Sequence, residues 1–335
     1  MQNLEIGVVV VVYESADVII DCVRSLLASE GARLRIIICD NASPDESVVM
    51  LRRFAAEIDI PLLELVEGEL APVKKLPDTG ITILRLPVNG GFAAGANAGL
   101  RLLLKEAGVG LFWVLNPDCV VARDTAAQYV CCAETTGAFA LMGGRVVFME
   151  CPHLIQADGA RVNRWTGVVR CVNQRGLPDE TMPPDPATLD FITGANMVAS
   201  RTFLETRGLM KETYFLYYEE VEWAFRRGEL PLIFCSKALV YHHGGTSIGT
   251  GTLTRRASGF ANYFNFRNRI RFVARCMPWS LPGAYLYSMA KVGQILLQGG
   301  FDEAVGALLG LHQLPPSAAV RKRLSPAALR RITQK

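Results

Sequence analysis

The sequence predicts an α/β fold built on a mostly parallel, Rossmann-like sheet, and three observations support this prediction. Short apolar runs alternate with segments of helical periodicity through the first 145 residues. Residues 8–12, 35–39 and 111–115 are rich in β-branched and other large apolar side chains, as strands buried on both faces are. The segments between these runs are long enough for the crossover helices that parallel neighbours require.

The other elements of the first half follow from capping and turn residues. Residues 15–30 carry apolar side chains at helical spacing, and residues 43–46 (Ser-Pro-Asp-Glu) supply a cap, a proline and acids to start a second helix. Residues 61–80 contain three prolines and are expected to form a long surface loop. A strand at residues 81–86 and a helix at residues 91–107, entered through glycines, complete this half.

The pattern changes after Gly143. Residues 145–172 are expected to form hairpins, residues 189–199 a strand and residues 219–228 a short helix. From Ser258 onward, helical periodicity dominates.

Composition and charge indicate a folded globular protein with a basic C-terminal part. Half of the 335 residues are hydrophobic and 20% are charged. From Leu253 to the end there are 13 Lys and Arg against two acids, whereas the first 252 residues carry a net charge of −8. This asymmetry indicates an anionic partner (a membrane surface, a phosphorylated lipid or nucleic acid), with solubility alone as the open alternative. Residues 278–300 are apolar but interrupted by Lys291 and two prolines, which favours an interfacial amphipathic helix over a membrane span.

The nine cysteines and the N-terminus favour a cytoplasmic protein. The apolar run at residues 6–12 is short and lacks a basic leader, so no signal peptide is expected. The cysteines are scattered and lack metal-binding spacing, which favours buried free thiols in a reducing compartment. Cys39, Cys131, Cys171 and Cys235 stand in apolar runs and are expected to be buried.

Polar residues follow the predicted strands at the edge where ligands bind to parallel sheets. Tyr13 and Glu14 follow the first strand and Asp40 ends the second. Asp40 offers a carboxylate to the imide N–H of a uracil or thymine ring, or else caps the following helix. Asp118, two residues after Asn116, suits Mg²⁺ or Mn²⁺ as a hard oxygen ligand, and an ordinary Asx turn is the alternative.

A glycine-rich stretch, residues 89–97 (Asn-Gly-Gly-Phe-Ala-Ala-Gly-Ala-Asn), stands where a helix is expected to begin. Such a loop brings backbone N–H groups close to a phosphate or a sugar. Its glycine spacing differs from the dinucleotide fingerprint, and it follows the third strand rather than the first.

Three acids fall within one predicted helical turn. Glu222 stands four residues before Arg226 and is expected to form a surface ion pair with it. Glu219 and Glu220 are surrounded by aromatic residues, which would raise a carboxyl pKa and suit it to general-base chemistry. The alternative is that these acids decorate the start of a helix. His242, after a short apolar strand, is either a metal ligand or a structural histidine.

Taken in this order, the motifs resemble the rhamnosyltransferase-like branch of glycosyltransferase family 2, whose fold is the nucleotide-diphospho-sugar transferase fold called GT-A. The resemblance runs from Val8 to about Arg275. Its motifs are Val10-Val11-Val12-Tyr13, Cys39-Asp40-Asn41-Ala42-Ser43, Asn89-Gly90-Gly91-Phe92-Ala93, Leu115-Asn116-Pro117-Asp118, Thr193-Gly194-Ala195, the stretch at residues 215–222, the stretch at residues 240–247 that includes Gly244-Gly245-Thr246-Ser247, and Arg267-Asn268-Arg269.

The resemblance implies a role for each motif. Asp40 would bind the pyrimidine base, and Asp118 with His242 would hold Mg²⁺ or Mn²⁺. Of the paired acids Glu219 and Glu220, the second would be the catalytic base. The residues expected at the donor are Val12, Tyr13, Glu14, Asp40, Asn89, Gly91, Phe92, Asn97 and Asn116. The residues expected at the acceptor are Gly194, Ala195, Tyr218, Arg267 and Arg269.

The resemblance also implies a reaction and an organisation of the chain. The expected enzyme is an inverting, metal-dependent hexosyltransferase that uses dTDP-L-rhamnose or a UDP-sugar. The expected acceptor is a saccharide, free or linked to a polyprenyl diphosphate, in cell-surface polysaccharide synthesis. Residues 1–252 would form the GT-A domain, with a donor half at 1–118 and an acceptor and catalytic half at 119–252. Residues 253–335 would form a basic helical extension at the inner face of the cytoplasmic membrane. Its cationic contacts would come from Arg255, Arg256, Arg267, Arg269 and Arg271.

Three other classes of protein compete with this interpretation. A non-catalytic module that binds sugar nucleotides or glycans would lack the metal or base position, and both positions are filled here. A nucleotidyltransferase or NAD-dependent oxidoreductase fits poorly, because the paired glutamates follow a hairpin region and the dinucleotide fingerprint is missing. A nucleic-acid-binding protein would interleave aromatic residues with the C-terminal arginines, and few are found there.

Overall fold

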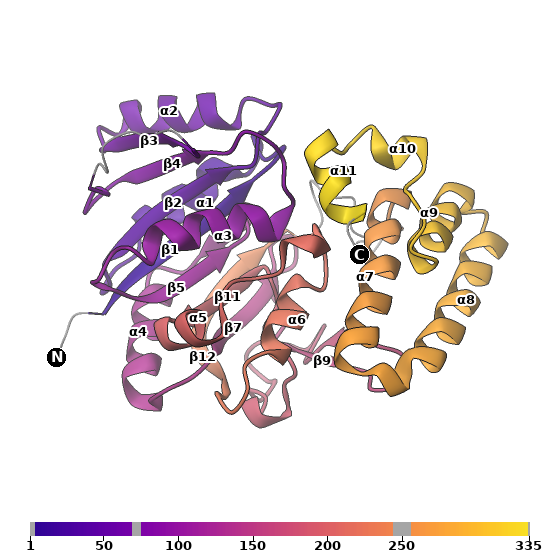
Figure 1. Cartoon of the computed structure of the whole chain (residues 1–335). Helices are drawn as coiled ribbons and strands as arrows, with labels where there is room; N and C mark the ends of the chain where they lie inside the picture. Colours follow the sequence, from indigo (N-terminus) through magenta and orange to yellow (C-terminus); the bar gives the residue numbers. More distant parts are fainter. Residues whose placement is uncertain (1–3, 69–74, 244–255, 334–335) are drawn as a thin grey trace.

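A ten-stranded mixed sheet, with helices on both faces, forms the body of the part of the chain that the computed structural model describes (Figure 1). The described residues are 4–68, 75–243 and 256–333. Two sequence predictions concern residues outside these ranges: the motif Gly244-Gly245-Thr246-Ser247 and the lipid contact of Arg255. The strands are β1 (Glu5–Val12), β2 (Leu34–Asp40), β3 (Leu62–Val66), β4 (Ile81–Arg85), β5 (Val109–Leu115), β6 (Cys119–Val121), β7 (Leu141–Phe148), β8 (Ile155–Ala157), β9 (Ala160–Val162), β10 (Val169–Cys171), β11 (Asn196–Ser200) and β12 (Leu232–His242).

The sheet runs in the order β3-β4-β2-β1-β5-β11-β7-β12-β6, with β8 beside β7. Strands β3, β4, β2, β1 and β5 are parallel neighbours. β11 is antiparallel to both β5 and β7, and β7 is parallel to β12. The carboxyl ends of β1, β2, β5 and β12 therefore lie at the same edge of the sheet. β1, at the centre, is buried along its whole length, which explains its continuous apolar run.

Helices cover both faces of this sheet (Figure 1). The helices are α1 (Ile19–Leu27), α2 (Ser47–Glu57), α3 (Phe92–Leu103), α4 (Thr125–Thr136), α5 (Arg201–Arg207), α6 (Glu219–Phe225), α7 (Gly259–Cys276), α8 (Leu281–Leu297), α9 (Phe301–Leu311), α10 (Ala318–Arg321) and α11 (Pro326–Thr333). Three single 3₁₀ turns lie at Pro186–Thr188, Glu212–Tyr214 and Pro278–Ser280. Residues of α1, α2 and α4 pack against one face, and residues of α3, α5 and α6 against the other.

Helix α3 lies close to the sheet because it carries glycines on the side that faces β1. A Cβ atom at Gly95 would stand 2.6 Å from Val11, and one at Gly99 would stand 2.7 Å from Val9. Both distances are shorter than real carbon contacts, so any larger residue would push the helix away. The glycines after residue 91 therefore serve packing of the helix on the sheet.

The C-terminal helices α7–α11 form an orange-to-yellow group beside the sheet (Figure 1). Phe272 and Val273 of α7 are fully buried in the same hydrophobic cluster as β1 and α3 residues, so this part shares a core with the sheet. The predicted helical character after Ser258 agrees with the structure, whereas the boundary between residues 252 and 253 lies outside the described residues. Among the helices described, none has the length and apolarity needed to span a bilayer.

Several expected elements differ from those observed. The segment at residues 61–80 is not all loop, because it contains the edge strand β3. Ser43 does not cap α2, which starts at Ser47; the Asp45 carboxylate instead accepts hydrogen bonds from the hydroxyls of Ser43 and Ser47. The strand expected at residues 189–199 begins only at Asn196.

The thiols follow the expectation only in part. Cys39 and Cys235 are buried, but Cys131 and Cys171 are exposed. All nine cysteines are free. Cys131 and Cys171 lie on outer faces of α4 and β10, where an apolar sequence neighbourhood does not ensure burial.

Candidate active site

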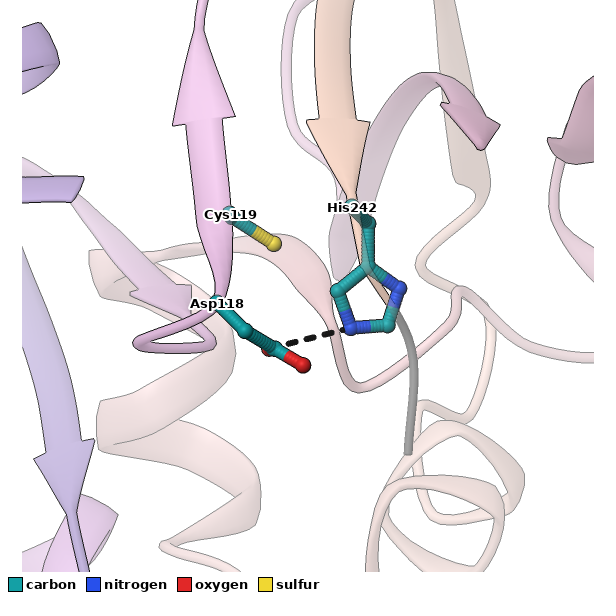
Figure 2. A group of neighbouring side chains, drawn as sticks. All are labelled: Asp118, Cys119 and His242. Carbon is teal, nitrogen blue, oxygen red and sulfur yellow. Dashed lines mark ion pairs between the residues drawn. The ribbon is translucent and has the colours of Figure 1, made fainter. Parts of the chain in front are cut away.

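Asp118 and His242 meet at the carboxyl edge of the sheet (Figure 2). Asp118 lies between the end of β5 and the start of β6, and His242 ends β12, which pairs with β6. One carboxylate oxygen of Asp118 is 3.1 Å from Nε2 of His242. Both residues are buried, so the sequence-predicted pair is brought together by strands that are more than 100 residues apart.

The surroundings of His242 suit a metal ligand. Its Nδ1 is 2.6 Å from Oε1 of Gln156, an acceptor that requires the proton on Nδ1 and leaves the Nε2 lone pair facing Asp118. Nδ2 of Asn116 lies 3.4 Å from Nε2 of His242. A carboxylate oxygen and an imidazole lone pair that converge at this distance are a donor set that accepts Mg²⁺ or Mn²⁺.

Cys119 completes the group of neighbouring ligand-type side chains in Figure 2, but its chemistry differs. Burial, followed by the charge of Asp118, raises the pKa of the Cys119 thiol well above its usual value. Its Sγ is 3.5 Å from the carbonyl oxygen of Ala195 and donates to it. A protonated thiol is a poor ligand for a hard cation, so Asp118 and His242 are the two fitting ligands.

Asp40 lines an open pocket of about 370 Å³ at the end of β2. The pocket is formed by Asp40, Ala42, Ser43, Val66, Arg85, Leu86 and Pro87. The Asp40 carboxylate accepts the N–H of Ser43 at 2.9 Å and lies 3.8 Å from Nε of Arg85. Burial raises the pKa of Asp40, and the bond from Ser43 and the charge of Arg85 oppose this rise. The helix-capping alternative fails, because α2 starts seven residues after Asp40.

The residues after β1 lie beside this pocket. Val12 is fully buried and pairs with Asp40 in the parallel register, so its side chain belongs to the core. Tyr13 is half-buried and Glu14 is exposed. Glu14 has a left-handed backbone (φ 52°), and its N–H donates to the Ser43 hydroxyl at 2.7 Å. Of these three positions, Tyr13 and Glu14 are the ones that reach the protein surface.

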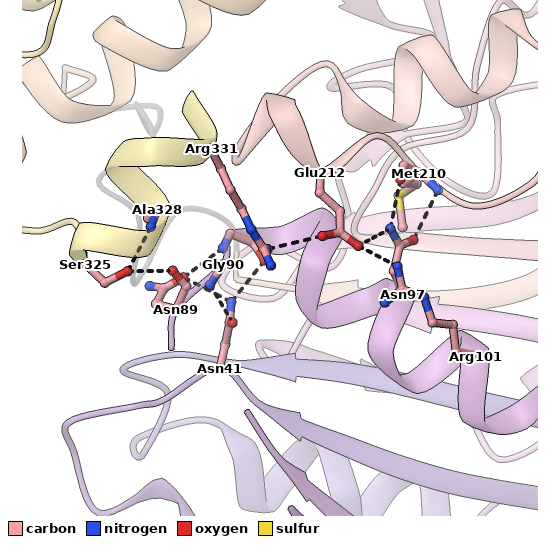
Figure 3. A network of polar contacts seen from close by, with 11 residues as sticks. Asn41, Asn89, Gly90, Asn97, Arg101, Met210, Glu212, Ser325, Ala328 and Arg331 are labelled. Atoms are coloured by element: carbon pink, nitrogen blue, oxygen red, sulfur yellow. Dashed lines mark hydrogen bonds and ion pairs between the residues drawn. The ribbon is translucent and has the colours of Figure 1, made fainter. Parts of the chain in front are cut away.

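The glycine-rich loop is held by internal hydrogen bonds (Figure 3). The N–H of Gly90 donates to the Asn41 side chain at 3.0 Å, and that of Gly91 donates to the Asn89 side chain at 2.9 Å. The N–H of Phe92 donates to the carbonyl of Phe215 at 2.8 Å. All three N–H groups thus already have partners inside the protein, which gives the loop a structural role, and its contact with a phosphate stays a prediction.

Gly91 is required by packing. Its φ is 88°, and a Cβ atom there would lie 2.3 Å from the carbonyl oxygen of Phe215. Only glycine fits this combination of a positive φ and a close backbone. The loop thus supports the segment that precedes the paired glutamates.

Asn97 was expected at the donor, and its placement does not support that role. It is buried, its Nδ2 donates to the carbonyl of Met210 at 2.8 Å, and its Oδ1 accepts the Met210 N–H at 3.1 Å (Figure 3). Glu212, next to it, forms ion pairs with Arg101 at 2.7 Å and with Arg331 at 3.1 Å. These contacts tie α3 to the C-terminal helix α11.

Glu222 is buried, contrary to the expected surface position. Its carboxylate is fully enclosed and lies 3.1 Å from Lys211, 2.9 Å from Arg226 and 3.7 Å from Arg275. The predicted pair with Arg226 exists, but two further cations surround the same carboxylate. A buried charge is tolerated only when it is paired, and three partners provide this. Glu222 therefore anchors α6.

Glu219 and Glu220 differ in exposure at the start of α6. Glu219 is 3% exposed and its Oε2 has no hydrogen-bond partner among the described residues, whereas Glu220 is half-buried. Burial, followed by the charge of Glu220, raises the pKa of Glu219 well above its usual value. Burial also raises the pKa of Glu220, to about 7, although backbone N–H groups at the helix start oppose the rise. Glu220 is therefore the acid poised to exchange a proton near neutral pH.

The segment between Thr193 and Asn196 connects the two groups of the site. A Cβ atom built at Gly194 would lie 3.7 Å from the Glu220 side chain, so Glu220 lies beside this glycine. The carbonyl oxygen of Ala195 accepts the N–H of Asn116 at 3.0 Å. Gly194 and Ala195, which were predicted at the acceptor, thus link the surroundings of Glu220 to Asn116, two residues before Asp118.

The other predicted acceptor residues are structural. The Tyr218 hydroxyl donates to the carbonyl of Gly167 at 2.8 Å, and its ring is 3% exposed. Arg267 is 1% exposed and donates to backbone carbonyls. Arg269 is buried, bonds to the Ser288 hydroxyl at 2.6 Å and lies over the Phe266 ring. Burial of Arg267 and Arg269 also argues against the lipid-phosphate contact that was expected of these two arginines.

Of the other arginines predicted to contact lipid, the structure describes Arg256 and Arg271. Arg256 is exposed and donates to the carbonyl of Gln298. Arg271 is half-buried and donates to the Gln313 side chain. Among these predicted arginines, Arg256 has the outward position that a membrane contact needs.

The sequence did not single out two side chains that order the site. Gln156 is bonded to Nδ1 of His242, and Arg85 lies beside Asp40. Asn41, which belongs to one of the predicted motifs, holds the glycine loop, a role that the motif did not indicate. Arg85 stands at the end of a predicted strand, which was an available signal. Gln156 lies in a short strand with no motif around it, and nothing in the sequence marks it.

The fold and this edge of the sheet define a glycosyltransferase of the GT-A fold, and comparison with known proteins specifies the family. Residues 7–208 match the model of glycosyl transferase family 2. The chain belongs to this family, which confirms the predicted resemblance at the level of the family. A curated relative is the low-salt glycan biosynthesis hexosyltransferase Agl10 of Haloferax volcanii. It is 22% identical over 267 residues, which are 79% of this chain and 74% of that protein.

Three solved structures share the fold at low sequence identity. S. aureus TarS 1-349 in complex with UDP-GlcNAc has a TM-score of 0.54 at 11% identity, covering 98% of this chain and 90% of that one. GalNAc-T7 with UDP, GalNAc and Mn²⁺ has a TM-score of 0.57 at 13% identity, covering 92% and 56%. The mannosyltransferase PcManGT from Pyrobaculum calidifontis, in complex with GDP-Man and Mn²⁺, has a TM-score of 0.50 at 14% identity, covering 98% and 85%. These likenesses confirm the predicted fold class.

Proposed function

We propose that this glycosyltransferase transfers a sugar from a nucleoside-diphosphate donor to an acceptor hydroxyl with inversion, and that Glu220 is the base. The observation that carries the proposal is the half-buried Glu220 carboxyl, with its pKa raised to about 7, which lies beside Gly194. The adjoining Ala195 connects it to Asn116, two residues before Asp118. In a direct displacement, the base that activates the acceptor and the site that holds the departing diphosphate lie on opposite sides of the sugar. A base at Glu220 and a diphosphate site at Asp118, linked by residues 194–195, fit this requirement.

The residues divide the reaction between them. The Glu220 carboxylate takes the proton of the acceptor hydroxyl while that oxygen forms a bond to the anomeric carbon. The bond between the anomeric carbon and the diphosphate breaks in the same step, and the nucleoside diphosphate leaves with the electron pair. Attack from the face opposite the leaving group inverts the anomeric configuration.

Asp118 and His242 would hold Mg²⁺ or Mn²⁺ through one oxygen and one nitrogen. Such a cation, when bound, neutralises charge that develops on the departing diphosphate. Gln156 keeps the His242 lone pair directed at Asp118, and the remaining ligands would come from phosphate oxygens and water. The solved Mn²⁺ complexes of GalNAc-T7 and PcManGT support a metal at this fold's site.

The pocket at Asp40 supports a pyrimidine donor. A uracil or thymine ring in the pocket would donate its imide N–H to the Asp40 carboxylate, and Tyr13 and Glu14 would line its rim. Both dTDP-L-rhamnose and UDP-sugars carry such a base. The curated relative is a hexosyltransferase of glycan biosynthesis, which supports a saccharide acceptor, free or lipid-linked.

Donor hydrolysis tests the proposed function. We expect UDP-GlcNAc or dTDP-L-rhamnose to release its nucleoside diphosphate slowly with Mn²⁺ or Mg²⁺ and much less with EDTA, while GDP-mannose stays intact. Release would be followed by chromatography, and UDP and dTDP binding by calorimetry. Release from GDP-mannose alone would overturn the pyrimidine assignment. Binding without release, even with added saccharide acceptors, would favour the second candidate, a non-catalytic sugar-nucleotide-binding protein.

An apolar face on α8 and α9 supports association with an anionic membrane. Leu286, Met289 and Leu297 fall on one side of α8 at 100° per residue, and Leu297 is 91% exposed. Trp279 before the helix and Phe301 after it are also exposed. Two exposed aromatic residues that flank an aliphatic face are typical of helices that lie in the membrane interface. The exposed Arg256, whose guanidinium reaches the carbonyl of Gln298 just after α8, and the surplus of positive charge after Leu253 favour anionic lipids.

Liposome sedimentation tests this association. We expect the protein to sediment with vesicles that contain phosphatidylglycerol and much less with pure phosphatidylcholine. Trp279→Ser combined with Leu297→Ser should abolish sedimentation without changing donor hydrolysis, because both side chains lie outside the site. Met182→Ser, at another exposed apolar residue, is the matched control and should sediment normally. Equal sedimentation of the double variant would contradict the assignment of this face.

A further inference from the structure

The segment before the paired glutamates has an unusual backbone. Phe215, Tyr217 and Tyr218 have φ values of 65°, 67° and 69°, in the left-handed region that residues with side chains rarely adopt. Glu219 and Glu220 follow directly as the first two residues of α6. Such a conformation persists only where the surrounding structure holds it. The direction in which Glu220 leaves this segment therefore depends on whatever holds it.

Asn268 of α7 is the side chain that holds the segment. It is fully buried, and its Nδ2 lies 2.8 Å, 2.6 Å and 3.1 Å from the carbonyl oxygens of Tyr214, Leu216 and Tyr217. One amide nitrogen thus meets three carbonyls of the same turn. A primary amide can do this because its two N–H groups diverge and each can be shared.

Arg267 orients this amide. Its Nη1 donates to Oδ1 of Asn268 at 2.6 Å, which directs Nδ2 toward the turn, and it also reaches the carbonyl of Thr213 at 3.3 Å. Its Nη2 donates to the carbonyl of Ile332 in α11. The arginine therefore joins three parts of the chain: α11, α7 and the turn before α6.

The opposite side of the turn is held by the glycine loop. The carbonyl of Phe215 accepts the N–H of Phe92, and Gly91 leaves room for this contact. The turn is thus held between Asn268 on one side and the start of α3 on the other. Neither Asn268 nor Arg267 is placed at the candidate site, so any effect on the reaction is exerted through the turn.

We propose that Asn268, oriented by Arg267, is a positioning residue that sets the backbone before α6 and thereby the place of the Glu220 carboxylate. This inference rests on the proposed role of Glu220 as the base. The sequence motif Arg267-Asn268-Arg269 then has an internal function, because the arginines serve the fold and the asparagine serves the base. Misplacement of a base by about 1 Å lowers a rate by on the order of 100-fold while leaving donor binding in place.

The test compares Asn268→Ala with Asn262→Ala. Asn262 lies on the same helix, is also buried, and bonds to the carbonyl of Ala257 instead of the turn. Three measurements are made on the full chain. They are hydrogen–deuterium exchange of peptides covering residues 212–225, binding of UDP with Mn²⁺ by calorimetry, and release of UDP from UDP-GlcNAc. If dTDP-L-rhamnose proves to be the donor, dTDP replaces UDP in the last two measurements. We expect Asn268→Ala to speed exchange in this segment alone, to bind nucleotide within about twofold of wild type, and to release it about 100-fold more slowly. Asn262→Ala should match wild type in all three.

Two outcomes would overturn the inference. One is a folded Asn268→Ala protein that releases nucleotide at the wild-type rate; the other is faster exchange throughout the chain with a proportional loss of nucleotide binding. If Asn268→Ala fails to fold, Arg267→Lys decides, because the guanidinium reaches its partners from two nitrogens, Nη1 for Asn268 and Thr213 and Nη2 for Ile332, whereas an ammonium has only one. That variant should show the same split between binding and release, and wild-type release would count against the inference. The proposed function fails separately, if Glu220→Gln releases nucleotide like wild type.

Discussion

Replacing Glu220 by glutamine is expected to slow donor turnover by at least about 100-fold, the lower end of what general-base catalysis contributes. The amide keeps the size of the side chain and its place beside Gly194, but it cannot take the proton of the acceptor hydroxyl. Nucleotide binding and the melting temperature Tm should stay close to wild type, since the change removes no packing. The measurement is release of the nucleoside diphosphate at saturating donor, together with calorimetry.

The pH dependence provides an independent check on the same residue. Because burial raises the pKa of Glu220 to about 7, the carboxylate that accepts a proton is lost as the pH falls below that value. The wild-type rate should therefore level off above about pH 7 and fall about tenfold per unit well below it. Glu220→Gln should lack this limb of the profile. A rate that is flat between pH 5 and 8, with the enzyme folded throughout, would assign the proton transfer to another group.

Glu219→Gln is the matched control for Glu220→Gln. Glu219 is enclosed and its pKa is raised in the folded protein, so this carboxyl ionises at a lower pH in the unfolded state than in the folded state. The free energy of unfolding therefore falls as the pH rises above the pKa that Glu219 has in the unfolded state. The glutamine variant should melt at a higher Tm than wild type at pH 8, and the two should converge near pH 4. Its turnover should remain within a few-fold of wild type. A collapse of turnover in Glu219→Gln with normal turnover in Glu220→Gln would reverse the assignment.

Replacing Asp118 by asparagine is expected to have the second largest effect, on metal binding. Changing a residue that only orients a metal ligand costs about 10–100-fold in affinity or activity, so losing the charged ligand itself should cost at least as much. Calorimetry with Mn²⁺ and UDP together should show the loss directly. Turnover should fall in parallel. It should recover at raised Mn²⁺ only if Asp118→Asn still binds the ion weakly.

Cys119→Ser is the control for the metal site. The thiol lies in the same cluster but donates to the Ala195 carbonyl, and serine can make the same bond. Mn²⁺ binding should therefore be unchanged. Loss of Mn²⁺ binding in Cys119→Ser, with Asp118→Asn unaffected, would mean that the thiolate is the ligand and the proposed pair is wrong.

The positions of Asp40, Asn116 and Asp118 were predictable from the sequence because of a geometric rule. Continuous apolar runs mark strands buried on both faces, and the carboxyl ends of parallel strands lie at one edge. Polar residues that follow such runs must therefore gather there, whatever the rest of the chain does. The fold class and the family were predicted on the same residues and are confirmed by the structure and the comparisons.

The roles of charged and amide side chains away from these strand ends were not predictable. Glu222 and Arg226 have the spacing of a surface pair, but Lys211 and Arg275 enclose the same carboxylate from segments distant in sequence. Asn97 stands in a glycine-rich stretch that favours ligand contact, yet its amide is used by the backbone of Met210. Spacing along one helix shows which residues lie on the same face of that helix. It gives no information about which other segments of the chain cover that face.

The sequence by itself determined the order of the elements, the central strands of the sheet and the edge at which Asp40, Asn116 and Asp118 lie. These features depend on local hydrophobic patterning and on the direction of parallel strands, and short segments of the chain determine both. Only the tertiary structure decided that Arg267 and Arg269 are buried, that Glu220 rather than Glu219 faces outward, and that the glycine loop is bonded internally. These outcomes depend on desolvation and on hydrogen bonds between residues as much as 236 positions apart, such as Asn89 and Ser325, and no local pattern encodes them.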